Sequence, residues 1–312
     1  MLHLRTVFDV GDKQNLERLL LRAQVLKRQR AQRRLAPTLS GRVVGMLFEK
    51  PSTRTRASFE AGIALLGGSS VVLHGRDTQL ASASAEGGEP LRDAARVLGS
   101  YVDALVVRAL THADVEELAK HAKVPVVNGL SELDHPCQVI TDLFTVFERK
   151  ERPFEVKWAY VGEAQGTANG LVALASLTGI ELSLALPEQQ SPDAELMQRA
   201  KAAGAKVRVV RDPAAAVAGA DVVSTDAWSS LVGLEGAKRD KRAAALAAFQ
   251  VNDALVANAA DDHVVLHPLP ARRGLEITDD VLEGMHSVAF QQAGNRLPVQ
   301  QALLEWLLGV PL

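Results

Sequence analysis

The residues best suited to do chemistry follow the end of an apolar segment. Val43–Phe48 is apolar, and the next residues include the run PSTRTR at 51–56. This pattern predicts a buried strand leading into a helix, whose first-turn N–H groups lack partners and, with the helix dipole, attract an anion. Guanidinium groups suit phosphate oxygens because they donate hydrogen bonds in pairs. The candidate phosphate-binding residues are Ser52, Thr53, Arg54 and Thr55.

A simpler explanation of the same run is a capped helix with a solvated basic first turn. For Arg-Thr-Arg alone, the two explanations are equally good. Arg54 and Arg56 would both lie near the positive end of the helix dipole, where cations are unfavourable unless an anion is bound. The charge pattern therefore favours an anion site.

Two further segments carry polar residues in places where ligands collect. Arg108 stands at the end of a strand expected over 103–107, and DHPCQ at 134–138 precedes an apolar-periodic helix. In open α/β sheets, ligands bind beyond the carboxyl ends of the strands. We therefore expect Arg108 to face the same crevice as the hydroxyl-rich turn at 52–55. Taken alone, His135 is more simply explained as a hydrogen-bonded residue at a helix N-terminus.

The composition limits the kinds of partner. The chain has 312 residues, of which 47% are hydrophobic and 23% charged, which is enough for two domains. With a net charge of −2, the chain has no overall positive potential that would attract nucleic acid or an anionic membrane, so neither is expected as a partner. The single cysteine, Cys137, excludes an intrachain disulfide and a cysteine-rich metal site. The sequence shows neither a signal-peptide core nor a membrane-length apolar run, so a cytoplasmic location is expected.

Strand and helix patterns alternate along the whole chain. The expected strands are 43–48, 70–74, 103–107, 124–127, 157–161, 181–186, 206–210, 221–225, 263–266 and 287–290. The segments between most of them carry helical patterns, and a last helix is expected over 297–309. Such units predict an α/β protein with two doubly wound parallel-sheet domains and a cleft between them. The charged run RKERPFEV at 149–156 marks the expected domain boundary.

Several motifs together resemble the aspartate and ornithine carbamoyltransferase superfamily. They are FEKPSTRTR at 48–56, Arg108 after the Tyr-Val-Asp-Ala strand, and HPCQ at 135–138. Four more motifs resemble the ornithine branch: TDAW at 225–228, FQVN at 249–252, HPLPARRG…EIT at 267–278, and GNRLPVQQALLEWLL at 294–308. The resemblance runs nearly end to end. It implies a carbamoyl phosphate domain at 1–148, an amino-acid domain at 149–290, and a C-terminal helix at 291–312 that packs back on the first domain.

The resemblance implies transfer of a carbamoyl group from carbamoyl phosphate to the side-chain amine of ornithine, giving citrulline and phosphate, as in arginine biosynthesis. Arg108, His135 and Thr55 would act in catalysis, with Arg108 bridging phosphate and carbamoyl oxygen and His135 donating to that oxygen. Gln138 would hold the carbamoyl amide, and Arg296 would reach the substrate from the last helix. The departing phosphate itself acts as the base that accepts the proton, so no metal or organic cofactor is expected.

The resemblance also implies a homotrimer, or a multiple of trimers, with active sites at the subunit contacts. Gln79, in the small-residue loop 75–90, matches a residue that family members place in the neighbouring subunit's site. Alternatively, Gln79 is an ordinary solvent-exposed residue of the loop. The stretch that follows it is longer than the usual pattern of the family.

The amine side departs from the family pattern. Asp226 would pair with the α-ammonium of the acceptor, and Ser230 and Leu231 stand where the family has a mobile Ser-Met-Gly loop, here SSLVG with one residue added. The usual Asp-Gly-Asn-Asn is EAQG at 163–166, and the cysteine of His-Cys-Leu-Pro is Pro268. The remaining candidate amine-binding residues are Gln165, Gly166 and Leu269.

Three alternatives follow from these departures. Either Asp226 with new neighbours such as Glu163 and Gln165 binds ornithine in another way, or the acceptor is a different amine. The third alternative is a carbamoyl phosphate-binding homologue without turnover. If aspartate were the acceptor, basic residues would be expected around 226–233 for its second carboxylate, and the sequence does not show them there. Arg272 and Arg273 keep aspartate open as an alternative acceptor. A nicotinamide-dependent oxidoreductase is disfavoured because GEAQG at 162–166 lacks the G-x-G-x-x-G order.

Overall fold

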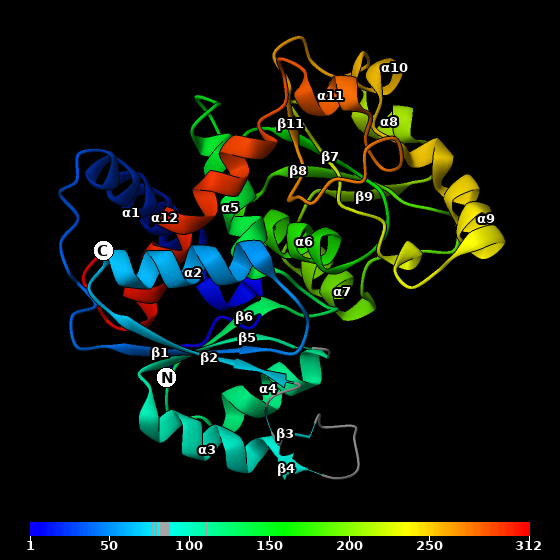
Figure 1. The fold of residues 1–312 in the computed structure, drawn as a ribbon. Coiled ribbons are helices and arrows are strands. Elements are labelled where there is room, and N and C mark those ends of the chain that lie inside the picture. Colours follow the sequence, from blue (N-terminus) through cyan, green and yellow to red (C-terminus); the bar gives the residue numbers. More distant parts are fainter. Residues whose placement is uncertain (76–77, 79, 82–87, 110) are drawn as a thin grey trace. The chain divides into compact units, whose positions relative to one another are not determined.

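The computed structural model describes residues 1–75, 78, 80–81, 88–109 and 111–312 of the chain. The described residues form two compact units (Figure 1). The first unit consists of Met1–Phe144 together with Asn295–Leu312, and the second unit is Thr145–Gly294. Each contains a parallel β-sheet with helices packed on it. This confirms the predicted α/β class with two parallel sheets in two domains.

The first unit is built on a sheet with the described strand order β2-β1-β5-β6. Its strands are β1 (Val43–Phe48), β2 (Ser69–His74), β5 (Ala104–Arg108) and β6 (Val126–Leu130). The short strands β3 (Leu80–Ala81) and β4 (Glu89–Pro90) form a separate two-stranded sheet. Its helices are η1 (Val7–Val10), α1 (Lys13–Ala31), α2 (Thr53–Leu65), α3 (Leu91–Tyr101), α4 (His112–His121) and α5 (Pro136–Phe147), whose last residues lie beyond the unit boundary.

Burial of both faces explains the apolar strands of this sheet. Five of the six residues of β1 are buried, as expected for a central parallel strand. Helices α3 and α4 cover one face, where Leu91 and Leu118 join Leu105 and Val107 of β5 in one hydrophobic cluster. Figure 1 shows α2 on the opposite face. The carboxyl ends of β1 and β5 lie together because Phe48 pairs with Arg108.

The C-terminal helix α12 (Ala289–Leu307) enters the first unit at Asn295. Its Glu305 is fully buried and accepts hydrogen bonds from Arg22 Nε at 2.6 Å and Thr38 Oγ1 at 2.5 Å. Helix α12 also approaches α2 closely, since a Cβ on Gly62 would lie 3.2 Å from Gln301 Cγ. The Gln301 amide donates to the Gly62 carbonyl at 3.0 Å. These contacts fix the end of the chain within the first unit.

The second unit has the described strand order β11-β10-β7-β8-β9. The strands are β7 (Lys157–Val161), β8 (Glu181–Ala185), β9 (Val207–Val210), β10 (Val222–Ser224) and β11 (Val264–Leu266). The helices are α6 (Gly166–Thr178), α7 (Ala194–Ala202), α8 (Pro213–Val217), η3 (Ser229–Leu231), α9 (Gly236–Leu246), η4 (Ala247–Phe249), α10 (Asp253–Val256) and α11 (Asp279–Glu283). Figure 1 shows α6 and α7 on one face of the sheet and α8, α10 and α11 on the other.

The prediction of a strand over 287–290 is wrong. Only Ser287 forms a bridge, to Val265, and α12 already begins at Ala289. The helix therefore starts eight residues before the expected 297 and contains Pro298 in its interior. The apolar Val288 and Phe290 resemble a strand in sequence, but the chain pairs only briefly with β11 before turning into the helix.

Among the described residues, no helix combines the length and apolar character needed to cross a membrane.

Candidate active site

The turn between β1 and α2 presents an open helix N-terminus. Ser52 is the N-cap residue, with an extended backbone, and its side chain makes no capping hydrogen bond to the described chain. The first intrahelical bond is donated by Arg56 N to Ser52 O, so the N–H groups of the preceding helical residues have no intrahelical acceptor. A cavity of about 560 Å³ lies at this turn, and its polar lining residues are Glu49, Lys50, Ser52, Thr53, Arg56, Glu60 and His74. This geometry suits an anion at the turn.

Two of the predicted arginines converge on Thr55. Arg296 Nη2 donates to Thr55 Oγ1 at 2.6 Å, and Arg108 Nη1 does so at 3.4 Å. Thr55 is only 1% exposed. A hydroxyl accepts two hydrogen bonds and donates one, so the two guanidinium groups leave the Thr55 hydrogen for a third group. The chain thus brings together residues 55, 108 and 296 from three distant segments.

Gln138 belongs to the same group. Its Oε1 accepts from Arg296 Nη1 at 2.8 Å, and its Nε2 donates to Asp142 Oδ1 at 2.7 Å. The two bonds fix the orientation of the Gln138 amide, with its oxygen toward Arg296 and its nitrogen toward Asp142, because the guanidinium only donates and the carboxylate only accepts. Asp142 was not identified from the sequence. It stands four residues after Gln138, and residues at that spacing on a helix lie on the same face and can contact each other.

The site is strongly cationic and partly desolvated. Burial, with the charges of Arg108 and Arg54 adding to it, lowers the pKa of the Arg296 guanidinium to about 10. Burial also lowers the pKa of Arg54. Like charges held together away from water are costly, and an arriving anion removes that cost. Arg56 is directed elsewhere, to Glu60 Oε2 at 3.0 Å and to His74 Nε2 at 3.1 Å.

His135 joins this group as a neutral donor. It directly precedes α5 and is 6% exposed, and its Nδ1 has no hydrogen-bond partner in the described part of the chain. Burial lowers its pKa well below the usual 6.5, and the charges of Arg296 and Arg108 lower it further. The imidazole is therefore neutral at pH 7. A neutral ring carries one N–H group, so it donates one hydrogen bond.

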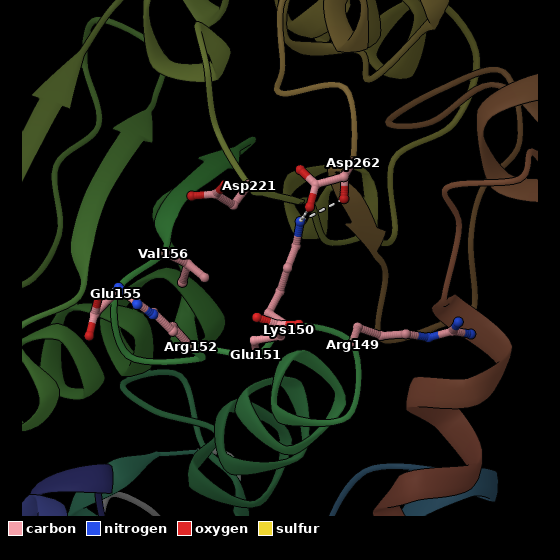
Figure 2. Close-up of a pocket in the computed structure, with 8 residues that line it drawn as sticks. All are labelled: Arg149, Lys150, Glu151, Arg152, Glu155, Val156, Asp221 and Asp262. Carbon is pink, nitrogen blue, oxygen red and sulfur yellow. Dashed lines mark hydrogen bonds and ion pairs between the residues drawn. The ribbon is translucent and has the colours of Figure 1, made fainter.

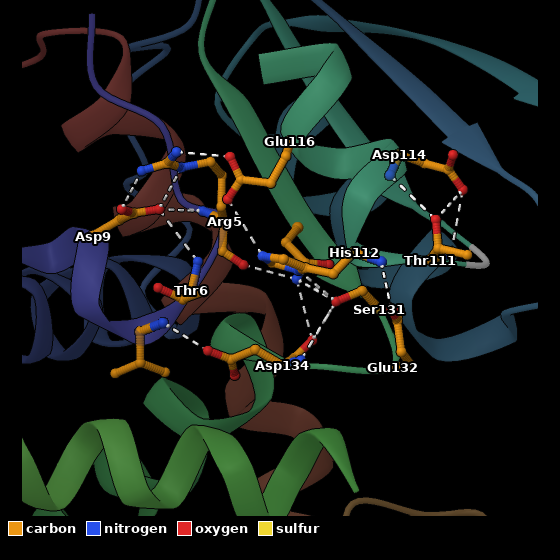
Figure 3. A network of polar contacts seen from close by, with 12 residues as sticks. Arg5, Thr6, Asp9, Thr111, His112, Asp114, Glu116, Ser131, Glu132 and Asp134 are labelled. Atoms are coloured by element: carbon orange, nitrogen blue, oxygen red, sulfur yellow. Dashed lines mark hydrogen bonds and ion pairs between the residues drawn. The ribbon is translucent and has the colours of Figure 1, made fainter. Parts of the chain in front are cut away.

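The turn that carries His135 is held by the N-terminal segment. Asp134 is fully buried, and its Oδ2 accepts the Val7 N–H at 2.9 Å. Asn128 Nδ2 donates to Arg5 O, Ser131 Oγ and Asp134 O at 2.8 to 3.2 Å. Figure 3 shows Arg5, Ser131 and Asp134 in this network. Burial raises the pKa of Asp134 to about 7.

Gln79, predicted as a shared-site residue, lies outside the described residues.

In the second unit, Asp226 follows β10 and accepts two hydrogen bonds. Thr167 Oγ1 donates to its Oδ2 at 2.7 Å, and Ala227 N donates to its Oδ1 at 2.7 Å. Burial raises the pKa of this carboxyl, and the Thr167 hydrogen bond partly opposes that shift. Thr167 was missed because only the fold places it beside Asp226. A desolvated carboxylate of this kind suits an ammonium group.

The other predicted amine-binding residues have varied surroundings. Gln165 Nε2 donates to Ala227 O at 3.1 Å, and Gly166 is the first residue of α6. The Ser230 backbone N–H donates to Glu163 Oε2 at 3.0 Å, and its hydroxyl accepts from Arg242 Nε at 2.8 Å. Leu231 is 3% exposed and belongs to the hydrophobic core of the unit. Gln165, Asp226 and Ser230 therefore lie in one hydrogen-bonded group, whereas Leu231 packs inward.

Pro268 and Leu269 lie in a turn after β11 that is organised by His267. The buried His267 ring accepts the Leu269 N–H at Nδ1, at 2.9 Å, and its Nε2 lies 3.1 Å from Glu276 Oε1. The acceptor role of Nδ1 places the ring hydrogen on Nε2, facing the carboxylate. Leu269 packs against the hydrophobic core of the unit.

A separate surface hollow of about 590 Å³ has no predicted site residue in its lining (Figure 2). Two of its three lining cations pair with carboxylates: Lys150 Nζ contacts Asp262 Oδ2 at 2.7 Å, and Arg152 Nη1 contacts Glu155 Oε2 at 3.1 Å. The third, Arg149, donates to the neutral amide oxygen of Gln291 at 2.7 Å. Carboxylates thus share this lining with the cations, and no candidate substrate-binding residue belongs to it.

Comparison with known proteins places these residues in a family. Residues 3–148 match the carbamoyl-P binding domain of the family described as "Aspartate/ornithine carbamoyltransferase", and residues 155–307 match its Asp/Orn binding domain. The chain belongs to the aspartate/ornithine carbamoyltransferase family. Within that family, it is 45% identical over 308 residues to an ornithine carbamoyltransferase of Desulfotalea psychrophila, covering 98% of this chain and 99% of the relative. The corresponding protein of Archaeoglobus fulgidus is 44% identical over 309 residues, covering 99% and 98%.

Solved structures of the family have the same fold. The ornithine carbamoyltransferase from Pyrococcus furiosus superposes with a TM-score of 0.92 at 38% identity, covering 99% of this chain and 98% of that chain. A mutant N-acetyl-L-ornithine transcarbamylase superposes with a TM-score of 0.85 at 27% identity, covering 98% of this chain and 100% of that chain. The predicted family resemblance is confirmed, and one fold is shared by transferases named for two different acceptors.

Proposed function

We propose that the chain transfers the carbamoyl group of carbamoyl phosphate to the side-chain amine of ornithine, giving citrulline and phosphate, the arginine-biosynthetic direction. The observation that carries the proposal is the group formed in the first unit by Thr55, Arg108, His135, Gln138 and Arg296. These residues make a buried, cationic set of donors with a neutral imidazole. The relatives named ornithine carbamoyltransferase support ornithine as the acceptor.

Carbamoyl phosphate would bind with its phosphate at the N-terminus of α2. The first-turn N–H groups, the Ser52 and Thr53 hydroxyls and the Arg54 guanidinium are the proposed donors, and the open N-cap supports this. Gln138 would hold the carbamoyl amide. Arg296, bonded to both Thr55 and Gln138, would keep these two side chains in fixed positions.

The reaction needs donors aimed at one oxygen. The amine nitrogen attacks the carbonyl carbon, negative charge builds on the carbonyl oxygen, and the bond to phosphate then breaks. Arg108, the His135 N–H and the Thr55 hydroxyl are the proposed donors to that oxygen. Each donor of this kind typically contributes roughly 3–4 kcal/mol of transition-state stabilisation. The departing phosphate takes up the proton that the amine loses.

The amine side would use Asp226 to pair with the α-ammonium, with Gln165, Gly166, Ser230, Leu231, Pro268 and Leu269 as the proposed surroundings. The raised pKa of Asp226 supports this, because a cation beside the carboxyl stabilises its charged form. Gly166 and Pro268 replace an asparagine and a cysteine of the usual motifs, so they supply no side-chain hydrogen bond. We propose that ornithine is held through Asp226 and backbone groups instead.

A panel of acceptor amines tests the proposal. Isotope-labelled carbamoyl phosphate is offered with ornithine, N-acetylornithine, aspartate and lysine, and labelled ureido products are measured. Label transfer to ornithine above all others is expected, with the Arg108→Ala variant as the inactive control. Transfer to another amine would reassign the acceptor. Binding of carbamoyl phosphate without transfer to any amine would show a homologue without turnover.

We also propose a homotrimer, which the surface of the first unit supports. Strand β2 is at the edge of its sheet, where Val71 is 47% exposed. Leu65 of α2 and Val97 and Tyr101 of α3 are also exposed large apolar residues of this unit. Light scattering should give three times the mass of one chain. Val71→Lys should reduce that mass, whereas Val232→Lys, at a position 68% exposed in the second unit, should not.

A further inference from the structure

The turn after β7 is bonded to the segment after β10 at three alternate positions. Glu163 accepts the Ser230 N–H, Gln165 donates to Ala227 O, and Thr167 donates to Asp226, at 3.0, 3.1 and 2.7 Å. Strands β7 and β10 are neighbours in the sheet, so the two segments leave it side by side. The turn therefore sets the position of the segment that carries Asp226.

Glu163 is the most heavily bonded residue of this turn. It is 3% exposed, and its Oε1 accepts from Arg242 Nη2 at 3.0 Å and from Gln190 Nε2 at 3.2 Å. Although burial raises the pKa of the carboxyl, the donors around it lower the pKa overall, so it stays ionised. Its oxygens are occupied by protein donors. Glu163 is thus built to hold protein groups, and it is not positioned as a free carboxylate for the acceptor.

Arg242 completes a closed set of contacts. The same guanidinium that pairs with Glu163 donates through Nε to Ser230 Oγ at 2.8 Å. The backbone N–H and the hydroxyl of Ser230 are thereby both held by the Glu163–Arg242 pair. Removing either charge would leave the other partly buried without its partner, a strongly unfavourable situation. The segment 226–233 would then lose its fixed position.

We propose that Glu163 and Arg242 are positioning residues that set the affinity for the acceptor amine by holding the Asp226–Gly233 segment in place. The proposal rests on the proposed function, in which Asp226 binds the acceptor. The pair touches protein groups and not the reacting atoms. Its loss should therefore weaken acceptor binding and leave carbamoyl phosphate binding unchanged, because the donors for that substrate lie in the first unit.

Steady-state kinetics of Glu163→Gln and Arg242→Met provide the test. We expect the KM for ornithine to rise at least about tenfold in each variant. The KM for carbamoyl phosphate should stay within about twofold of the value for the unmodified enzyme, and kcat within about threefold. This pattern is expected when a variant weakens the binding of the substrate and of the transition state equally. Arg242→Lys keeps the charge with fewer donors and should lie between Arg242→Met and the unmodified enzyme. Because the two residues act together, the double variant should be little worse than either single one. Arg239→Met, at an exposed position of the same helix, is the matched control and should change nothing.

Hydrogen exchange of residues 226–246 without substrates gives a second, independent measurement. Exchange should be faster in Glu163→Gln and Arg242→Met than in Arg239→Met. An unchanged KM for ornithine, equal rises for both substrates, or unchanged exchange would each overturn the proposal. If the unmodified enzyme did not carbamoylate ornithine, the proposed function would fail. The exchange measurement would still decide whether the pair holds the segment.

Discussion

Two strand-to-helix turns, one in each unit, are surrounded by side chains of opposite charge. In the first unit, β1 leads into α2, and in the second, β7 leads into α6. In neither case does the N-cap residue, Ser52 or Gln165, make a capping hydrogen bond with its side chain to the described chain. The surroundings differ: Arg54, Arg108 and Arg296 gather near the first turn, whereas Asp226 lies at the second, beside the Glu163–Arg242 ion pair.

Under the proposed function, one backbone arrangement would serve two ligands of opposite charge. Burial lowers the pKa of Arg296 and raises the pKa of Asp226, so in both places desolvation disfavours the charged side chain. A bound anion stabilises the first group and a bound cation the second. Phosphate and ammonium are the ligands that we propose for the two turns, and side-chain charge rather than backbone geometry would distinguish them.

The largest effect is expected when the cationic group loses a member. Arg54→Ala and Arg108→Ala should abolish measurable carbamoyl phosphate binding, because each removes charge-assisted donors to the substrate. Calorimetry measures the affinity directly. Arg96→Ala, which removes an exposed arginine paired with Asp93 in the same unit, is the control and should bind normally. Unchanged affinity in Arg54→Ala and Arg108→Ala would refute the anion site.

His135 tests whether a neutral donor is needed in that cationic group. His135→Leu should lower kcat by roughly 10²–10³, the usual loss for one donor to a developing oxyanion. Because burial and the two arginines lower its pKa well below 6.5, the ring should stay neutral as the pH falls to 6. NMR of labelled histidine measures this. Titration of His135 near pH 6.5 would contradict the described electrostatics.

Asp226→Asn probes the anionic turn. The variant should raise the KM for ornithine by roughly 10–100-fold, since it removes the charge that pairs with the ammonium, while carbamoyl phosphate affinity stays the same. In the unmodified enzyme, this KM should rise as the pH falls through the raised pKa of Asp226, because only the ionised carboxyl binds the cation. The variant should lack that pH dependence. A parallel loss of both affinities would place Asp226 outside the amine side.

The smallest effect concerns stability rather than activity. Asp134 has a pKa near 7 when folded, above the usual 3.8, so ionisation in the folded protein is unfavourable and stability is lost as the pH rises from about 4 to 7. Asp134→Asn keeps an acceptor for the Val7 N–H without the charge. Its Tm should exceed that of the unmodified protein by several degrees at pH 8, and the difference should vanish near pH 4. Equal Tm values at pH 8 would show that the carboxyl is well solvated.

Much of the fold could be predicted because parallel-sheet proteins show their strands plainly in sequence. The buried strand 43–48 and the helix that follows it were predicted with nearly the observed bounds, since apolar runs and turn residues are local signals. The strand over 287–290 was wrong because a short apolar run is ambiguous. The last helix was expected to begin at residue 297, whereas it begins at Ala289 and extends through Pro298.

The family and the types of donor available could be predicted from the amino-acid order, because Pro-Ser-Thr-Arg-Thr-Arg and His-Pro-Cys-Gln are contiguous motifs whose chemistry is visible in the residues. Which of those donors meet depends on how the chain folds. Thr55 and Arg296 are 241 residues apart in the chain, and their hydrogen bond exists because α12 returns to pack beside α2. The Glu163–Arg242 pair likewise depends on the folded position of α9 beside the turn after β7, a contact that no local pattern encodes.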